Sequence, residues 1–172
     1  MTEPTAAGGE RADLLKALAG QRYFLRYTVR ELTDEQAARR TTASELCLGG
    51  LIKHVTLTER QWIRFIQAGP SAMGGRDDAS MAEWAAAFRM LPGETLAGLL
   101  ADYEQAASST TEVVETLPDL DASQPLPPAP WFEPGARWTA RQVLLHVLAE
   151  TAQHAGHADI IRESLDGAKT MG

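Results

Sequence analysis

The sequence predicts an all-α protein: a four-helix bundle with a long proline-rich crossover before the last helix. Apolar residues recur at helical spacing through most of the 172 residues, and no segment shows the alternation that is typical of a strand. A cluster of prolines excludes a helix just before the last periodic segment. The length fits one domain. We place this domain at residues 11–167, between a disordered N-terminus at residues 1–10 and a C-terminal tail at residues 168–172.

The first two long helices are predicted at about residues 11–32 and from Thr42 to residues 69–70. The first carries apolar residues on one face, namely Leu14, Leu18, Leu25, Val29 and Leu32. Thr33-Asp-Glu-Gln36 and Thr42-Ala-Ser-Glu45 each fit the capping box, in which a hydroxyl and a carboxylate or amide satisfy backbone donors at a helix start. We therefore expect Thr42 to open the second long helix, which Gly69-Pro70 ends.

Three more helical segments follow in the second half of the chain. Ser80-Met-Ala-Glu83 fits the capping box and is expected to begin a short helix that Pro92-Gly93 ends. The third long helix is predicted at about residues 94–117. Thr139-Ala-Arg-Gln142 is expected to cap the fourth, which ends near Asp166-Gly167.

The connection at residues 118–137 holds five prolines between residues 125 and 134. A structureless connection of this length is uncommon in a compact domain. Trp131, Phe132 and the following Trp138 have the character of buried residues, so we expect this segment to pack against the bundle. We interpret the three rings as core packing, with a substrate-binding group as the alternative.

Composition excludes several classes of partner and site. The net charge is −7 and there is no basic cluster, which argues against nucleic acid and against an anionic membrane surface. No run approaches the roughly 20 apolar residues of a membrane span, and residues 1–10 lack the apolar core of a signal peptide, so a cytoplasmic protein is expected. Cys47 is the only cysteine, expected to be a small buried residue, so any metal must be held by nitrogen and oxygen.

Glu150 and His154 place a carboxylate and an imidazole on the apolar side of the fourth helix. At about 100° per residue, His154 lies near the middle of the apolar face, and Glu150 lies one turn earlier and roughly 40° to one side. An unpaired buried carboxylate costs several kcal/mol, so both groups need partners. A divalent metal ion is one candidate partner, and hydrogen bonding to each other or to Gln21 is the other.

The best candidate for a third donor is His54, because helical spacing places it on the inward face of the second long helix. Two imidazoles and one carboxylate suit Zn²⁺ and also accept Ni²⁺ or Fe²⁺. His146 and His157 share the side of the fourth helix that carries His154 but lie roughly 60 to 80° away. We interpret both as candidates for supporting a metal ligand or shuttling a proton, although His157 replaces Glu150 as a ligand if the helix rotates. No catalytic side chain is assigned.

The chain resembles the DinB/YfiT-like superfamily of metal-binding four-helix bundles. The resemblance rests on Leu48-Gly-Gly-Leu-Ile-Lys-His54-Val, on Trp138-Thr-Ala-Arg, and on Glu150-Thr-Ala-Gln-His154-Ala-Gly-His157-Ala-Asp, and it spans residues 11–167. It is closest to an actinobacterial branch in which glutamate replaces the first histidine of the general His-x-x-x-His pair. Mycothiol-dependent maleylpyruvate isomerase is similar in having a His, Glu, His ligand set.

This resemblance implies His54, Glu150 and His154 as metal ligands, the same three residues that helical spacing indicates. It also implies that the metal activates a low-molecular-weight thiol, such as mycothiol, for transfer to an electrophile or for isomerisation. The alternative is a metal-binding or stress-related bundle without turnover. Because bundles with such relatives often dimerise, a homodimer is one expected state.

Overall fold

The computed structural model describes residues 9–74 and 78–170. Most of the predicted disordered N-terminus, at residues 1–8, lies outside the described residues, as do residues 171–172 of the predicted tail. The elements are α1 (Glu10–Thr28), α2 (Asp34–Ala38), α3 (Leu48–Ala68), the 3₁₀-helix η1 (Gly69–Met73), α4 (Asp78–Ala86), α5 (Leu96–Thr116), β1 (Ser123–Pro125), β2 (Arg137–Thr139) and α6 (Ala140–Asp166).

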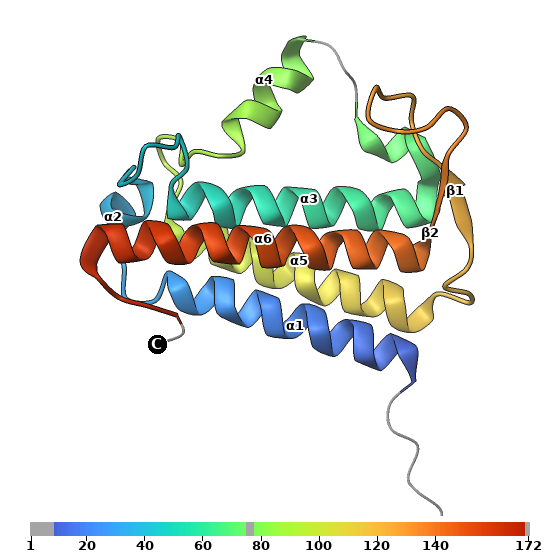
Figure 1. Ribbon diagram of the computed structural model, residues 1–172, viewed down its shortest axis with the longest axis horizontal. Coiled ribbons are helices and arrows are strands. Elements are labelled where there is room, and N and C mark those ends of the chain that lie inside the picture. The colour runs from blue at the N-terminus through green and yellow to red at the C-terminus, as the bar shows by residue number, and fades with distance from the viewer. Residues whose placement is uncertain (1–8, 75–77, 171–172) are drawn as a thin grey trace, which may run out of the picture.

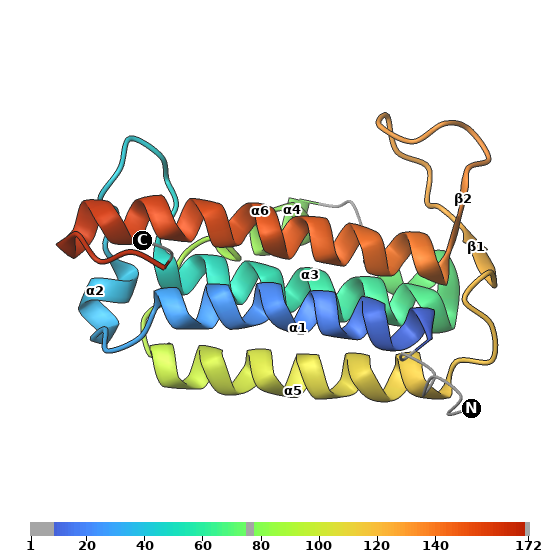
Figure 2. The same cartoon turned by 60° about the horizontal axis from the view of Figure 1, so that its bottom comes forward.

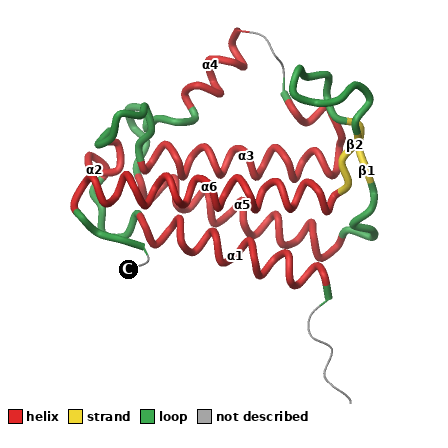
Figure 3. The backbone as a smooth tube through the Cα atoms, in the orientation of Figure 1, coloured by secondary structure: helices red, strands yellow, loops and turns green. Residues whose placement is uncertain are grey.

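The fold is a four-helix bundle of α1, α3, α5 and α6, as the sequence predicts (Figure 1). Helix α6 packs against α1 and α3, and α3 also packs against α5. The colour ramp in Figures 1 and 2 shows that α3 and α5 run in the same direction, opposite to α1 and α6. Residues 78–95 therefore carry the chain back along α3, and α4 lies on this return path (Figure 3). None of the described helices is long and apolar enough to cross a membrane.

Two of the four predicted capping boxes are correct. Thr33 begins α2 and Thr139 begins α6, each with both reciprocal hydrogen bonds in place. Thr42 is wrong as a helix start, because its hydroxyl instead accepts from the Ser44 backbone N–H in a turn and α3 begins at Leu48. Ser80 is also wrong as a cap, because α4 begins at Asp78 and Ser80 lies inside the helix.

The first helix ends earlier than predicted, at Thr28 rather than near Leu32. The buried guanidinium of Arg162, from α6, donates to the backbone carbonyls of Thr28 and Arg30, at 2.8 Å each. These carbonyls belong to the helix end, where intrahelical donors run out. A side chain that is distant in the sequence thus stabilises the end of α1 at Thr28. Helical periodicity could not predict this end, because it carries no information about contacts between helices.

The proline-rich connection stays at one end of the bundle and includes a short antiparallel pair of strands, β1 and β2 (Figure 1). Three residues per strand are too few for an alternation pattern, so the sequence did not predict them. Phe132 and Trp138 are partly buried and pack on the bundle as expected. Trp131 does not, because it is 73 % exposed.

Candidate metal centre

His54 lies on the buried side of α3, near the start of the helix. Its side chain is almost completely buried, at 3 % exposure. The ring stacks on Phe88, with centroids 4.0 Å apart, and meets Trp84 of α4 edge to face at 5.1 Å. Aromatic contacts therefore fix the orientation of this imidazole. Its Nδ1 atom is buried and has no hydrogen-bond partner among the described residues.

The structure brings His54, Glu150 and His154 together. Each offers one donor atom, and the three atoms lie within 4.8 Å of one another. The Oε2 atom of Glu150 is 3.5 Å from Nε2 of His154 and 3.8 Å from Nε2 of His54. Glu150 and His154 come from consecutive turns of α6, whereas His54 comes from the neighbouring α3. The three residues that helical spacing indicated thus converge on one point between two packed helices.

Electrostatics set both kinds of donor in the form that binds a cation. Hydrogen bonding to His154 and then to His54 holds the pKa of Glu150 well below its usual range, so the carboxylate is ionised at neutral pH. Burial lowers the pKa of His54, although Glu150 opposes this shift, so the imidazole is neutral at neutral pH. Ionised carboxylates and neutral imidazoles are the ligand forms of these side chains.

The two remaining histidines of α6 occupy different places. Nδ1 of His157 lies 3.3 Å from Nδ1 of His154, within hydrogen-bonding distance on the side of the ring away from Glu150. His146 touches none of the three clustered residues by hydrogen bond; its ring lies against Trp62 and Trp138 instead. The structure therefore separates two residues that the sequence placed in one class.

Two aromatic residues beside the cluster were not singled out in the sequence as site residues. Trp84 and Phe88 belong to α4 and the turn after it, and both rings contact His54. The sequence suggests only that they share a helical face, because they are four residues apart. Which residues they would meet depends on how residues 78–95 return along α3, and this path has no local sequence signal.

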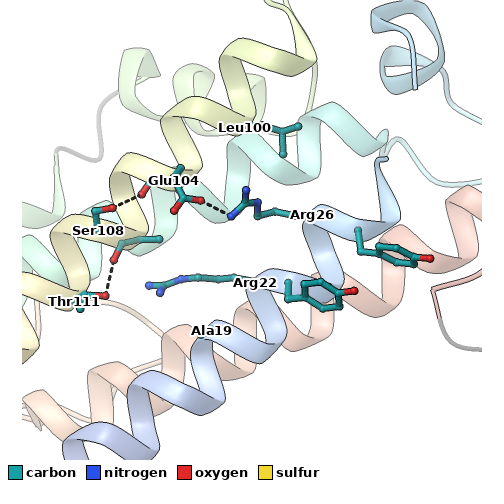
Figure 4. Close-up of a pocket in the computed structure, with 10 residues that line it drawn as sticks. Ala19, Arg22, Arg26, Leu100, Glu104, Ser108 and Thr111 are labelled. Carbon is teal, nitrogen blue, oxygen red and sulfur yellow. Dashed lines mark hydrogen bonds and ion pairs between the residues drawn. The ribbon is translucent and has the colours of Figure 1, made fainter. Parts of the chain in front are cut away.

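A cavity of about 550 Å³ lies away from this cluster, between α1 and α5 (Figure 4). Arg22, Arg26 and Glu104 are among the residues that line it. Arg26 is paired with Glu104 across the cavity, and Arg22 is paired with the buried Glu59. None of the three clustered residues lines it, so cavity size does not identify the candidate centre.

Comparison with known proteins gives the family of this chain. The sequence model of the mycothiol-S-transferase family matches residues 13–167. The chain belongs to the mycothiol-S-transferase family. This family assignment agrees with the DinB/YfiT-like resemblance seen in the sequence. A comparison with curated proteins finds no match.

A solved structure shares the fold of this mycothiol-S-transferase family member. YfiT from Bacillus subtilis, described as a probable metal-dependent hydrolase with an unusual four-helix bundle topology, superposes with a TM-score of 0.61. The two chains are 14 % identical, and the match covers 92 % of each. At this identity the likeness establishes the bundle topology.

Proposed function

We propose that this protein binds one divalent metal ion through His54, Glu150 and His154 and transfers a low-molecular-weight thiol, of the mycothiol kind, to an electrophile. The observation that carries the proposal is the convergence of three donor atoms within 4.8 Å in a chain of the mycothiol-S-transferase family. One carboxylate and two imidazoles leave at least one coordination position for a small molecule, as in catalytic zinc sites.

The distances from the Glu150 carboxylate to the two imidazoles suit a small divalent ion. Ligand atoms about 2.0–2.1 Å from a tetrahedral zinc ion lie roughly 3.4 Å apart. The separations of 3.5 and 3.8 Å from Glu150 Oε2 to the two Nε2 atoms are close to this value. Zinc is our first choice, and the same nitrogen and oxygen donors also accept nickel or iron.

Each nearby side chain has a role in this proposal. His54, Glu150 and His154 would hold the ion, which would lower the pKa of a coordinating thiol and so make its sulfur nucleophilic at neutral pH. His157 holds the His154 ring through the contact between their Nδ1 atoms, a type of support that metal-binding histidines commonly have. Trp84 and Phe88 hold the His54 ring and keep water from its face.

A transfer assay tests this function. With mycothiol and chlorodinitrobenzene, we expect a thioether to form: the sulfur–carbon bond forms as chloride leaves, and the thiol proton is released to solvent. Turnover should disappear on chelation, because the pKa of the thiol is then no longer lowered, and it should return when Zn²⁺ is added. Turnover that survives complete removal of metal would contradict a metal-dependent transferase. If the protein binds metal but transfers mycothiol to no electrophile tested, the non-catalytic bundle is favoured.

A further inference from the structure

His146 lies in a cluster of aromatic rings rather than among the donor residues. Its ring centroid is 4.8 Å from that of Trp62 on α3 and 5.1 Å from that of Trp138 on β2. The two indoles stack on each other, 4.9 Å apart and 24° from parallel. We call Trp62, Trp138 and His146 the aromatic cluster. Three different elements supply it, so the cluster exists only in the folded bundle.

Packing of the proline-rich connection against the bundle accounts for the two indoles, but not for the histidine. Trp62 and Trp138 join an apolar core that also contains Phe65 and Val143. Packing does not require ring nitrogens, and neither nitrogen of His146 is among the buried side-chain atoms without a hydrogen-bond partner, so both can be reached from outside. No hydrogen bond to His146 is found among residues 9–74 and 78–170. The ring nitrogens therefore offer a donor and an acceptor to a molecule from outside.

The charge state of His146 fits that role. Partial burial lowers the pKa of His146, although the Glu150 carboxylate acts in the opposite direction. The imidazole is therefore neutral at neutral pH, with one nitrogen donating and the other accepting. A neutral imidazole beside two indoles favours a flat aromatic partner.

The aromatic cluster lies beside the candidate metal centre on the same pair of helices. His146 is one turn from Glu150 on α6, and Trp62 is two turns from His54 on α3, which correspond to about 6 and 12 Å along the helix axes. Thr58 lies between them on α3, with its hydroxyl 3.5 Å from Nε2 of His54. A molecule the size of one substituted aromatic ring matches the shorter of these two separations, about 6 Å.

We propose that the aromatic cluster binds the electrophile, and that this electrophile is a flat aromatic or conjugated molecule with a polar substituent that hydrogen-bonds to His146. The molecule packs against the accessible parts of Trp138 and His146, which places its reactive carbon toward His54, Glu150 and His154. His146 is then a substrate-binding residue and not a proton shuttle. The role of the bound molecule as the electrophile rests on the proposed thiol transfer, but binding at this site can be tested without turnover.

Equilibrium dialysis with dinitroaniline tests the binding site. This probe has the flat ring and nitro groups of chlorodinitrobenzene but no leaving group, so it cannot react. We expect saturable binding at one site, with or without metal. Trp138→Leu should weaken the probe Kd roughly tenfold through loss of ring stacking. His146→Phe should weaken it roughly fivefold to tenfold through loss of one hydrogen bond, and His146→Gln should recover part of that loss.

Trp131→Leu is the matched control, because Trp131 is in the same connection and its ring contacts that of Phe132 rather than the aromatic cluster. We expect it to change the Kd less than about twofold. Melting temperature and metal content of each variant check that the fold and the donor cluster are intact. An unchanged Kd in both Trp138→Leu and His146→Phe would overturn the inference.

The transfer assay separates this inference from the proposed function. In His146→Phe, the KM for chlorodinitrobenzene should rise while the KM for mycothiol stays the same, because only the electrophile loses a contact. Turnover that is metal-dependent but insensitive to His146→Phe and Trp138→Leu would uphold thiol transfer and overturn the electrophile site. Specific dinitroaniline binding in a protein without turnover would uphold the site and overturn thiol transfer.

Discussion

At the scale of single residues, the candidate centre depends on two lowered pKa values in neighbouring groups, which favour a charged carboxylate and a neutral imidazole. The pKa of Glu150 is lowered by hydrogen bonding, which favours its charged form, and the pKa of His54 is lowered by burial, which favours its neutral form. Both shifts yield the ligand form at neutral pH. The inward direction of each side chain could be predicted from helical spacing, but the shifts could not, because they depend on contacts between α3, α4 and α6.

The same shifts predict how the metal-free protein responds to acid. Burial lowers the pKa of His54 and His146 below 6.5, so below about pH 6.5 the unfolded chain binds more protons than the folded one and stability falls. The Glu150 contribution, present above its ordinary pKa of 4.5, is lost at still lower pH. We expect the melting temperature of chelated protein to fall between about pH 7.5 and about pH 5.5.

The His146→Phe variant isolates one of these groups. It removes a titrating imidazole from the half-buried position, so its melting temperature should fall less over the same pH range than that of the wild type. Calorimetry at several pH values measures the difference. Parallel curves for the two proteins would show that His146 titrates alike in the folded and unfolded chain, contrary to its partly buried place beside two indoles.

At the scale of elements, two adjacent glycines explain how the return path of the chain meets α3. A Cβ atom at Gly50 would lie 2.0 Å from the carbonyl oxygen of Phe88, and one at Gly49 would lie 2.1 Å from the sulfur of Met90. The first clash is with backbone and the second with a flexible side chain. The start of α3 thus allows residues 88–90 to approach closely, and this approach brings the Phe88 ring onto His54.

Gly50→Ala should therefore destabilise the protein by about 1–3 kcal/mol, because the Phe88 backbone must move to admit the methyl group. Gly20→Ala is the matched control: Gly20 is also helical, nothing lies within 4 Å of an added Cβ, and the expected change is a stabilisation of about 0.5–1 kcal/mol. Urea unfolding measures both. Equal effects of the two substitutions would contradict a close approach at Gly50.

At the scale of the whole molecule, a buried polar group connects three of the four bundle helices. Glu59 of α3 is fully buried and accepts hydrogen bonds from Arg22 of α1, including one from Nε at 3.2 Å, and from the hydroxyl of Thr110 on α5. Buried ion pairs are weak sources of stability, but an unmatched buried charge is strongly unfavourable. Helix registers that separate these residues are therefore disfavoured.

The sequence predicted the elements better than the connections between them. Helical periodicity located the four bundle helices. It also placed His54, Glu150 and His154 on the inward faces of α3 and α6, where the structure brings them together. The Arg22–Glu59 pair was not predicted, because the partners are 37 residues apart and charged residues on an amphipathic helix are usually exposed. The predictions of the start of α3 and of a buried Trp131 were wrong for a similar reason, because long-range packing decides both.

Metal analysis of purified protein tests the central claim most directly. Wild type should bind one equivalent of Zn²⁺, and His54→Ala and His154→Ala should each lose stoichiometric binding while remaining folded. His157→Ala should keep one equivalent with about 10–100-fold lower affinity, because it supports a ligand without being one. Full occupancy and unchanged affinity in His154→Ala would contradict the proposal that α3 and α6 bring their donors together to hold a metal ion.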